Sequence, residues 1–399
     1  MLTASGLAVA AALLLVFLLV NLAGVRWLAR ANTAITAWKL VIPVVASIAL
    51  IIVGFNSANF TAFGFAPMGA DGVFAAVSAG GVMFSLFGFR TAIDMAGQAE
   101  NPQVSVPLAI IGAVVVSLAI YLMLQAAFIG VVPQAHLARG WANVSENVPG
   151  GPFAAFATIL GMQWLAAALY FDAVLSPSGT AIAYIGATAR INYALAQNGQ
   201  FPSLFLHLNR ESVPVWALLF NFVLGFLLFL PFPGWAELVG FISSAAVLSL
   251  AFGPVSMAAL RHQLPDEGRP FRLRAGMTLS TISFVLVGCV VYWSGWDTNW
   301  KVFALAFAGA LLLCLLHWKR GDFANLNLTE AAWFGLFVAG LAAISYLGNY
   351  GNGLKLLRHG SDLALVALLS LGVFWLALRT RLPAAKTKAL IAATLPEFD

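Results

Sequence analysis

The sequence predicts an all-α, polytopic membrane protein, and three properties of the chain point to this fold. Of its 399 residues, 61% are hydrophobic and only 9% are charged, whereas soluble globular chains carry about 25% charged residues. The mean hydropathy is +0.93. The apolar residues also form runs long enough to cross a bilayer, which takes about 20 helical residues, and a helix satisfies its own backbone polar groups there.

Eleven apolar runs predict eleven spans, at residues 6–22, 33–55, 72–94, 106–131, 164–188, 214–230, 238–260, 279–292, 302–317, 331–347 and 363–378. The first two are free of charge except for Lys39. The third is interrupted by glycines and ends in charged residues, while the fourth is a long uncharged run. The fifth and seventh carry polar residues, the eighth and ninth are short, and the last two are continuous. The longest polar stretch, 261–276, is only a loop.

Lys and Arg residues predict the orientation of the chain. If the loops are numbered after each span, the odd-numbered loops and the C-terminus hold fourteen of the twenty Lys and Arg residues. The even-numbered loops hold four, and Lys39 and Arg90 lie within or beside spans. Because cytoplasmic loops are enriched in Lys and Arg, we expect a cytoplasmic C-terminus. Such loops beside anionic lipid also explain the net charge of +5 without a nucleic-acid partner.

The N-terminus is predicted to face outside, since eleven spans separate it from the cytoplasmic C-terminus. Residues 1–5 carry no charge and do not resemble the charged beginning of a signal peptide. An odd number of missing upstream helices would explain this orientation, so we expect the chain to be truncated at its N-terminus.

No pattern in the sequence predicts an enzyme site. Cys289 and Cys314 fall in separate spans, and the five His residues are scattered. Neither a metal-binding spacing, nor a phosphate-binding loop, nor a dinucleotide fingerprint is present. We therefore expect no metal and no cofactor, and only an ion gradient as the source of energy.

The third span is the most informative part of the chain. It contains Gly80, Gly81 and Gly88, and each glycine costs a helix about 1 kcal/mol relative to alanine. Arg90 and Asp94 follow Gly88 closely. This pattern predicts a broken helix, whose free carbonyl and amide groups hold substrate or ions in many transporters. An ordinary kinked helix whose charges begin the next loop is the alternative.

Three segments resemble amino acid–polyamine–organocation permeases. The first, residues 84–110, reads FSLFGFRTAIDMAGQAENPQVSVPLAI and resembles the sixth helix of that family with its following loop. The second, residues 176–205, reads SPSGTAIAYIGATARINYALAQNGQFPSLF and resembles the eighth helix. The third, residues 21–40, reads NLAGVRWLARANTAITAWKL and resembles the junction of helices four and five. The resemblance covers about residues 21–271, and the last two spans make the pattern similar to bacterial aspartate/glutamate–proton symporters.

The resemblance implies an incomplete LeuT-like core of five plus five inverted-repeat helices. Residues 1–276 would then be family helices four to ten, and residues 277–399 would be accessory helices with a cytoplasmic tail. Three helices would be missing upstream, in agreement with the orientation argument. The missing first helix would carry the other break and the site for the substrate carboxylate.

The resemblance also implies a substrate site around the broken span. Phe84 matches the gating aromatic residue of the family, and Ser85, Phe87 and Gly88 match its unwound backbone. Arg90 stands where the family usually has Glu, so it is expected to favour an acidic substrate or to pair with Asp94. Ser243 in the seventh span is a further candidate for the lining. The alternatives are core phenylalanines, a structural Arg90–Asp94 pair and a serine bonded to its own helix.

Three residues are candidates for ion or proton coupling, together with Asp94. Lys39 matches the Lys that some sodium-independent family members place at the sodium site, and a desolvated ammonium group exchanges protons readily. Asp172 and Ser176 lie on one small, polar face of the fifth span, where Asp172 could accept a hydrogen bond from Lys39. Lys39 could instead extend to the membrane interface, and Asp172 could serve helix packing alone.

These interpretations predict a secondary transporter of the cytoplasmic membrane. We expect an amino acid as substrate, most plausibly an acidic one, with a proton or, as the second choice, sodium as coupling ion. Two alternatives remain open. The chain could be a truncated remnant that does not transport, or an amino-acid sensor or interaction protein on a permease scaffold.

Overall fold

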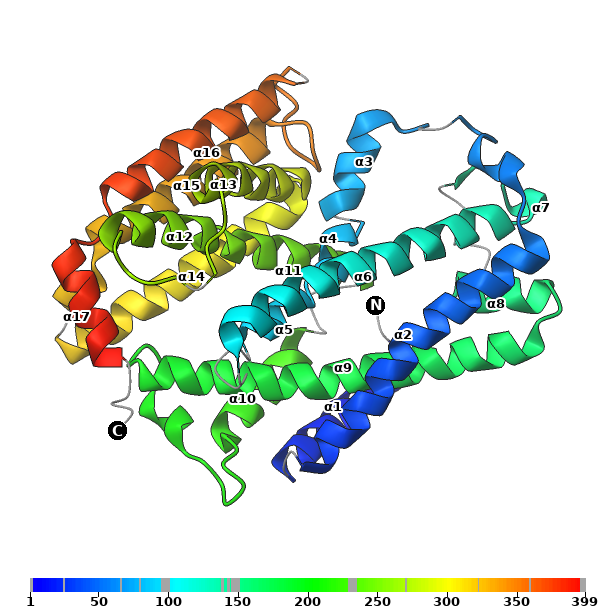
Figure 1. Ribbon diagram of the computed structural model, residues 1–399, viewed down its shortest axis with the longest axis horizontal. Helices are drawn as coiled ribbons and strands as arrows, with labels where there is room; N and C mark the ends of the chain where they lie inside the picture. Colours follow the sequence, from blue (N-terminus) through cyan, green and yellow to red (C-terminus); the bar gives the residue numbers. More distant parts are fainter. Residues whose placement is uncertain are drawn as a thin grey trace. The chain divides into compact units, whose positions relative to one another are not determined.

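The computed structural model describes residues 3–23, 26–64, 67–78, 80–94, 101–137, 140, 141, 144, 151–228, 235–269, 271–321, 323–358 and 360–394. Apart from two isolated β-bridges, the residues in these ranges form helices and their connecting loops. The chain divides into two compact units, which are described separately (Figure 1). The first consists of residues 1–69, 88–98 and 108–233, and the second of residues 70–87, 99–107 and 234–399.

The first unit is built around its longest helix. Helices α1, α2, α8 and α10 all pack against α9, and Figure 1 shows α2 crossing it. The helices of this unit are α1 (Ala4–Leu22), α2 (Arg26–Gly54), α5 (Phe89–Asp94), most of α6 (Pro102–Val131), α7 (Gln134–Leu137), α8 (Pro152–Ile159), α9 (Gln163–Gln197) and α10 (Val215–Leu228), with 3₁₀ turns η1 (Ser57–Phe60) and η4 (Ser203–Leu206).

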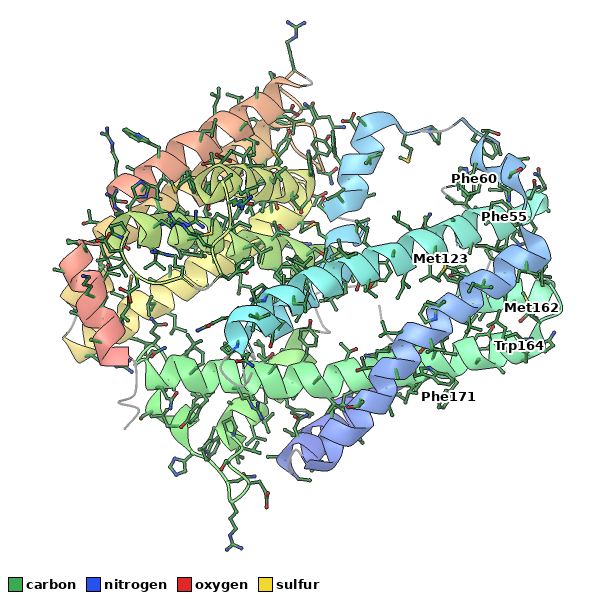
Figure 2. The ribbon with its side chains drawn as sticks, viewed as in Figure 1. Phe55, Phe60, Met123, Met162, Trp164 and Phe171 are labelled. Carbon is green, nitrogen blue, oxygen red and sulfur yellow. The ribbon has the colours of Figure 1, made fainter. Side chains whose placement is uncertain are left out.

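Two buried apolar clusters hold this unit together. One joins α2, α6, α8 and α9, through residues that include Leu50, Val131, Phe156 and Leu165. The other joins α1, α9, η4 and α10, through residues that include Leu18, Ala189, Phe205 and Leu218. Aromatic and apolar side chains also lie near the ends of these helices. Figure 2 shows Phe55 beside Phe60 after the end of α2, and Met162 and Trp164 at the start of α9.

The second unit contains the remaining helices. They are α3 (Gly69–Ser78), α4 (Val82–Leu86), α11 (Trp235–Leu250), α12 (Phe252–Gln263), α13 (Gly276–Trp293), α14 (Trp296–Arg320), α15 (Leu328–Leu347), α16 (Ser361–Arg379) and α17 (Ala384–Thr394), with the 3₁₀ turn η5 (Phe323–Leu326). Helix α16 packs against both α13 and α15. At this contact the ring of Phe284 lies 4.7 Å from that of Phe337 and 5.5 Å from that of Phe374, measured between centroids.

The helices confirm a polytopic membrane protein. Among the described residues, nine helical segments are long and apolar enough to cross a bilayer. A tenth predicted span corresponds to the shorter α10, and the third predicted span corresponds to α3, α4 and α5. Exposed apolar side chains such as Leu108, Val115 and Leu122 cover α6, as expected for a helix surrounded by lipid.

In the first unit, an odd-numbered loop contacts another odd-numbered loop, and an even-numbered loop contacts another even-numbered loop. The side-chain amide of Asn209, in the fifth loop, donates to the carbonyl of Leu22 at the first loop, with 3.3 Å between nitrogen and oxygen. In the second loop, the buried Asn59 donates to the carbonyls of Ile129 and Val132, at the fourth loop, both at 2.9 Å. Odd loops therefore meet odd loops, as a chain that crosses a bilayer repeatedly requires.

The second unit shows the same separation. The side chain of Gln263, at the start of the seventh loop, donates to the carbonyl of Leu382 in the C-terminal segment, with 2.6 Å between nitrogen and oxygen. Lys386 in that segment hydrogen-bonds Asn327 of the ninth loop. At even loops, the amide of Trp296 donates to the carbonyl of Tyr350 at 3.2 Å.

Candidate functional site

The predicted third span is discontinuous. Helix α3 ends at Ser78, and the amide of Gly80 donates to the carbonyl of Ala75, the 6→1 bond that closes many helices. A Cβ atom on Gly80 would lie 2.7 Å from the Ala76 backbone, and Gly81 has a φ of +85°, which favours glycine. A second interruption, at Phe87 and Gly88, separates α4 from α5. The span therefore breaks twice.

The predicted gating residue Phe84 and the three residues predicted to be unwound, Ser85, Phe87 and Gly88, fall into two groups. Phe84 and Ser85 lie inside α4, where the hydroxyl of Ser85 donates to the carbonyl of Val82 at 2.7 Å. The unwound backbone thus begins later than predicted, at Phe87, which is buried, and continues through Gly88. The division between the two units falls between these two residues.

Arg90 lies on α5, in the first unit, and is half-buried. Asp94 is the last residue of α5, and its side chain lies outside the described residues. The pair that the sequence suggested between these two residues therefore stays a prediction.

Helix α11 carries Ser243 and packs against α4 in the second unit. A Cβ atom on Gly81 would lie 3.4 Å from Cγ1 of Val239, one turn before Ser243. Ser243 is 1% exposed, and its hydroxyl has no hydrogen-bond partner among the described residues. Its neighbour Ser244 is fully buried and donates to Oδ1 of Asn299 at 2.9 Å. Of the two serines, Ser243 alone keeps a hydroxyl available for a ligand.

Two side-chain contacts hold α3 on the C-terminal helices of its unit. The hydroxyl of Tyr350, between α15 and α16, donates to Oδ1 of Asp71 at 2.8 Å. The ring of Phe74 stacks on that of Trp293, with 4.4 Å between centroids and 4° between planes. Burial of Tyr350 and its bond to Asp71 both raise the pKa of that phenol, so it remains a donor at neutral pH. One half of the discontinuous span is thereby fixed to α13 and to the α15–α16 loop.

A polar contact between α2 and α9 surrounds Lys39 in the first unit. The ammonium group of Lys39 donates to the hydroxyl of Thr180, which itself donates to the carbonyl of Ser176 at 3.1 Å. Lys39 lies thirteen residues after the first residue of α2 and fifteen before the last. The apolar segment of α2, Thr33–Gly54, begins six residues before Lys39, so extension of this side chain to the membrane interface stays an alternative prediction.

Asp172 accepts its hydrogen bond from a residue that sequence reasoning missed. The indole Nε1 of Trp38 donates to Oδ1 of Asp172, with 2.9 Å between the atoms. The Trp38 ring meets the edge of Phe171, which Figure 2 labels on α9, at 5.5 Å between centroids. Lys39 donates to Thr180 instead of showing the suggested hydrogen bond to Asp172, and the Asp172 carboxylate acts on Lys39 electrostatically.

Close packing of α2 on α9 brings these polar groups together. A Cβ atom on Gly179 would lie 2.8 Å from Cγ2 of Ile35, so any side chain at this crossing would force Ile35 or the helices to shift. Pro177 lies within α9, which nevertheless continues through it. The small face that the sequence indicated on α9 is therefore the face that contacts α2.

The described residues suit transport chemistry better than bond-making chemistry. Among them, no group of three His, Cys, Asp or Glu side chains could hold a metal ion. They instead provide the ammonium group of Lys39 and the carboxylate of Asp172 at the α2–α9 crossing. They also place the buried hydroxyl of Ser243 on α11, which packs against α4 of the discontinuous span. Such groups can bind and release a proton or a small polar solute.

Comparison with known proteins decides the family. A family model described as amino acid permease matches residues 3–313 of the chain. The chain belongs to the amino acid permease family. This permease is 36% identical over 387 residues to the aspartate–proton symporter of Bacillus subtilis (strain 168). The aligned region includes 96% of this chain and 74% of the symporter.

Other relatives of the permease are also transporters. It is 36% identical over 385 residues to the glutamate/serine transporter AimA of the same organism, covering 95% of the chain and 70% of that relative. It is 24% identical over 302 residues to the branched-chain amino acid permease BcaP, also from that organism. These relatives confirm the family predicted from the three motifs, an amino acid as substrate, and a membrane protein that is not an enzyme.

Proposed function

We propose that this permease is a secondary transporter that moves an acidic amino acid across the cytoplasmic membrane with a proton. The Lys39–Thr180 hydrogen bond at the α2–α9 crossing carries this proposal. In this proposal the ammonium group of Lys39, held between α2 and α9, takes the place of a separate sodium ion. When Lys39 is neutral its attraction to Asp172 disappears, which gives the helix crossing two states.

The positive charge of Arg90 supports an acidic amino acid as the substrate. Arg90 is a half-buried cation, and a cation drawn away from water in a membrane protein favours an anionic partner. The relatives named above include an aspartate–proton symporter and a glutamate/serine transporter. An aspartate or glutamate side chain would supply the anion that Arg90 favours.

Transport can be tested with the purified full chain in proteoliposomes. We expect uptake of labelled aspartate to be driven by an alkaline interior and to be insensitive to a sodium gradient. Lys39→Ala should lower proton-driven accumulation at least tenfold but preserve counterflow exchange within a few-fold. Accumulation that survives Lys39→Ala would overturn the coupling role, and accumulation driven by sodium alone would replace the proton.

Two control variants sharpen this experiment. Thr180→Val removes the hydrogen-bond acceptor but keeps the ammonium group, so it should shift the pH dependence of uptake and not abolish it. Arg190→Gln changes an exposed charge on α9 and should behave like the intact chain. If the intact chain shows no counterflow exchange in proteoliposomes, this result would favour the alternative of a non-transporting protein.

Substrate choice is tested separately at Arg90. Arg90→Gln should raise the KM for aspartate about tenfold or more and should change the KM for a neutral amino acid little. Equal KM values for aspartate in Arg90→Gln and the intact chain would contradict a contact between Arg90 and the substrate.

A further inference from the structure

The loop between α12 and α13 forms a basic cavity at the end of two membrane-spanning segments. The cavity has a volume of about 460 Å³, and Arg261, Arg272 and Arg274 line it together with the first turn of α13. The spans that flank the loop are Leu238–Gln263 and Gly276–Trp293. The cavity therefore lies within a few residues of the ends of both apolar segments, where lipid headgroups are expected.

Arg261 is built into one wall of the cavity. Its Nη2 donates to the carbonyl of Leu273 at 3.0 Å. A Cβ atom on Gly276 would lie 2.1 Å from Nη1 of Arg261, so the guanidinium lies directly against the start of α13. The guanidinium thus occupies the space that a side chain at residue 276 would fill.

Arg269 folds the loop so that the other two arginines remain available. Its guanidinium donates to the carbonyls of Leu260, Leu264 and Glu267, at 3.2, 2.6 and 3.0 Å. It thereby caps the end of α12 and closes the loop on itself. Arg272 and Arg274 are exposed, and the described residues include no carboxylate in an ion pair with either.

The chemistry of this cavity fits a phosphate group. Arg guanidinium groups bind phosphate oxygens through paired hydrogen bonds. The first amides of α13 add a favourable partial charge, because Ala275 provides no side-chain cap. The two carboxylates of the loop, Asp266 and Glu267, are not among the lining residues.

We propose that this cavity binds the phosphate of an anionic lipid headgroup. Basic pockets beside membrane helices bind such headgroups in other membrane proteins. A second basic cavity, of about 240 Å³, is lined by Arg379 and Arg381 and is joined to the loop by the Gln263–Leu382 hydrogen bond. Together, five arginines line the two cavities. The proposal depends on the membrane location alone and not on the transported substrate.

The test compares lipid binding by the purified full chain in neutral detergent. Short-chain phosphatidylglycerol, phosphatidylcholine and inorganic phosphate are titrated separately, and thermal unfolding is followed by tryptophan fluorescence. Phosphatidylglycerol should raise the Tm, whereas equal concentrations of the other two should not. In the double variant Arg272→Gln/Arg274→Gln, the concentration needed for half of this shift should increase at least tenfold.

The matched control removes two positive charges from the other end of the same unit. Lys355→Gln/Arg358→Gln changes two exposed residues of the α15–α16 loop and should respond to lipid as the intact chain does. An unchanged response in Arg272→Gln/Arg274→Gln would overturn the proposal. An equal response to inorganic phosphate would replace the lipid by a free anion. If the double variant does not fold, lipid retained by Arg274→Gln in native mass spectrometry decides the question.

Discussion

Ser243 and Ser244 are adjacent on α11, yet their hydroxyl groups have different environments. Ser244 donates to Asn299, whose side-chain amide donates to the carbonyl of Val291 at 2.7 Å and to the hydroxyl of Ser345 at 3.1 Å. Ser243 has no such partner in the described part of the chain. Ser244 therefore belongs to a structural network, whereas Ser243 is available for a solute.

This difference predicts opposite effects of two alanine variants. Ser244→Ala should lower the free energy of unfolding by about 1 kcal/mol, because Asn299 loses a buried donor. Ser243→Ala should leave stability nearly unchanged and raise the KM for substrate several-fold. Thermal unfolding in detergent and uptake in proteoliposomes measure the two effects, and the idea fails if Ser243→Ala transports with an unchanged KM.

At the residue scale the sequence predicted individual chemistry better than partners. Lys39 and Asp172 stood out because charges inside apolar runs are rare and expensive. Trp38 did not, because an aromatic residue in a span usually faces lipid or core. Its partner is 134 residues away, and no local pattern reports such a separation. Thr180, which accepts from Lys39, is 141 residues away and was not predicted as its partner for the same reason.

Helix α3 illustrates how elements are held by side chains from distant segments. Its first turn carries Asp71, which accepts from Tyr350, and its middle carries Phe74, which stacks on Trp293. If Tyr350→Phe removes the hydrogen bond alone, amide hydrogen exchange in residues 70–78 should increase by about fivefold, the equivalent of about 1 kcal/mol. Tyr346→Phe, on an exposed face of α15, is the matched control.

The pH dependence of this contact follows from the raised pKa of Tyr350. A phenol whose folded pKa lies above its unfolded value of about 10 stabilises the fold below pH 10 and loses that effect as the pH rises through the folded value. Protection of residues 70–78 should therefore be constant from pH 6 to pH 9 after correction for intrinsic exchange. A loss of protection below pH 9 would contradict this role of Tyr350.

The crossing of α2 and α9 gives a prediction about packing. Gly179→Leu places a side chain where a Cβ atom already lies 2.8 Å from Ile35, so it should separate the helices and disrupt the Lys39–Thr180 bond. We expect a destabilisation of about 1–3 kcal/mol and a large loss of uptake. Gly112→Ala, in open space on α6, should change neither; equal behaviour of the two variants would refute the close crossing.

Elements were easier to predict than their interruptions. Long apolar runs predicted the spans correctly, including the short eighth one, which extends as α13 from Gly276 to Trp293. The motif indicated the break at Gly88, but the separate break before α4 depends on the left-handed backbone of Gly81 and on the tight turn at Gly80. Glycine permits a left-handed backbone, and tertiary contacts determine whether it is used.

At the scale of the whole molecule, the loop contacts predict an accessibility experiment. In chains whose Cys289 and Cys314 are replaced by serine, Arg210→Cys should react with a membrane-impermeant thiol reagent only after cells are permeabilised. Arg358→Cys should react in intact cells, because it belongs to an even-numbered loop. The reverse pattern would invert the proposed orientation, and equal labelling would contradict the alternation seen in each unit.

The position of Lys39 has a consequence for the energetics of transport. It lies six residues after the start of its 22-residue apolar segment, Thr33–Gly54. A proton that reaches Lys39 from the nearer end of that segment would therefore cross about 30% of the membrane voltage. At roughly 2.3 kcal/mol per charge for each 100 mV, that step would contribute about 0.7 kcal/mol per 100 mV, so the loading of Lys39 should depend on voltage as well as on pH.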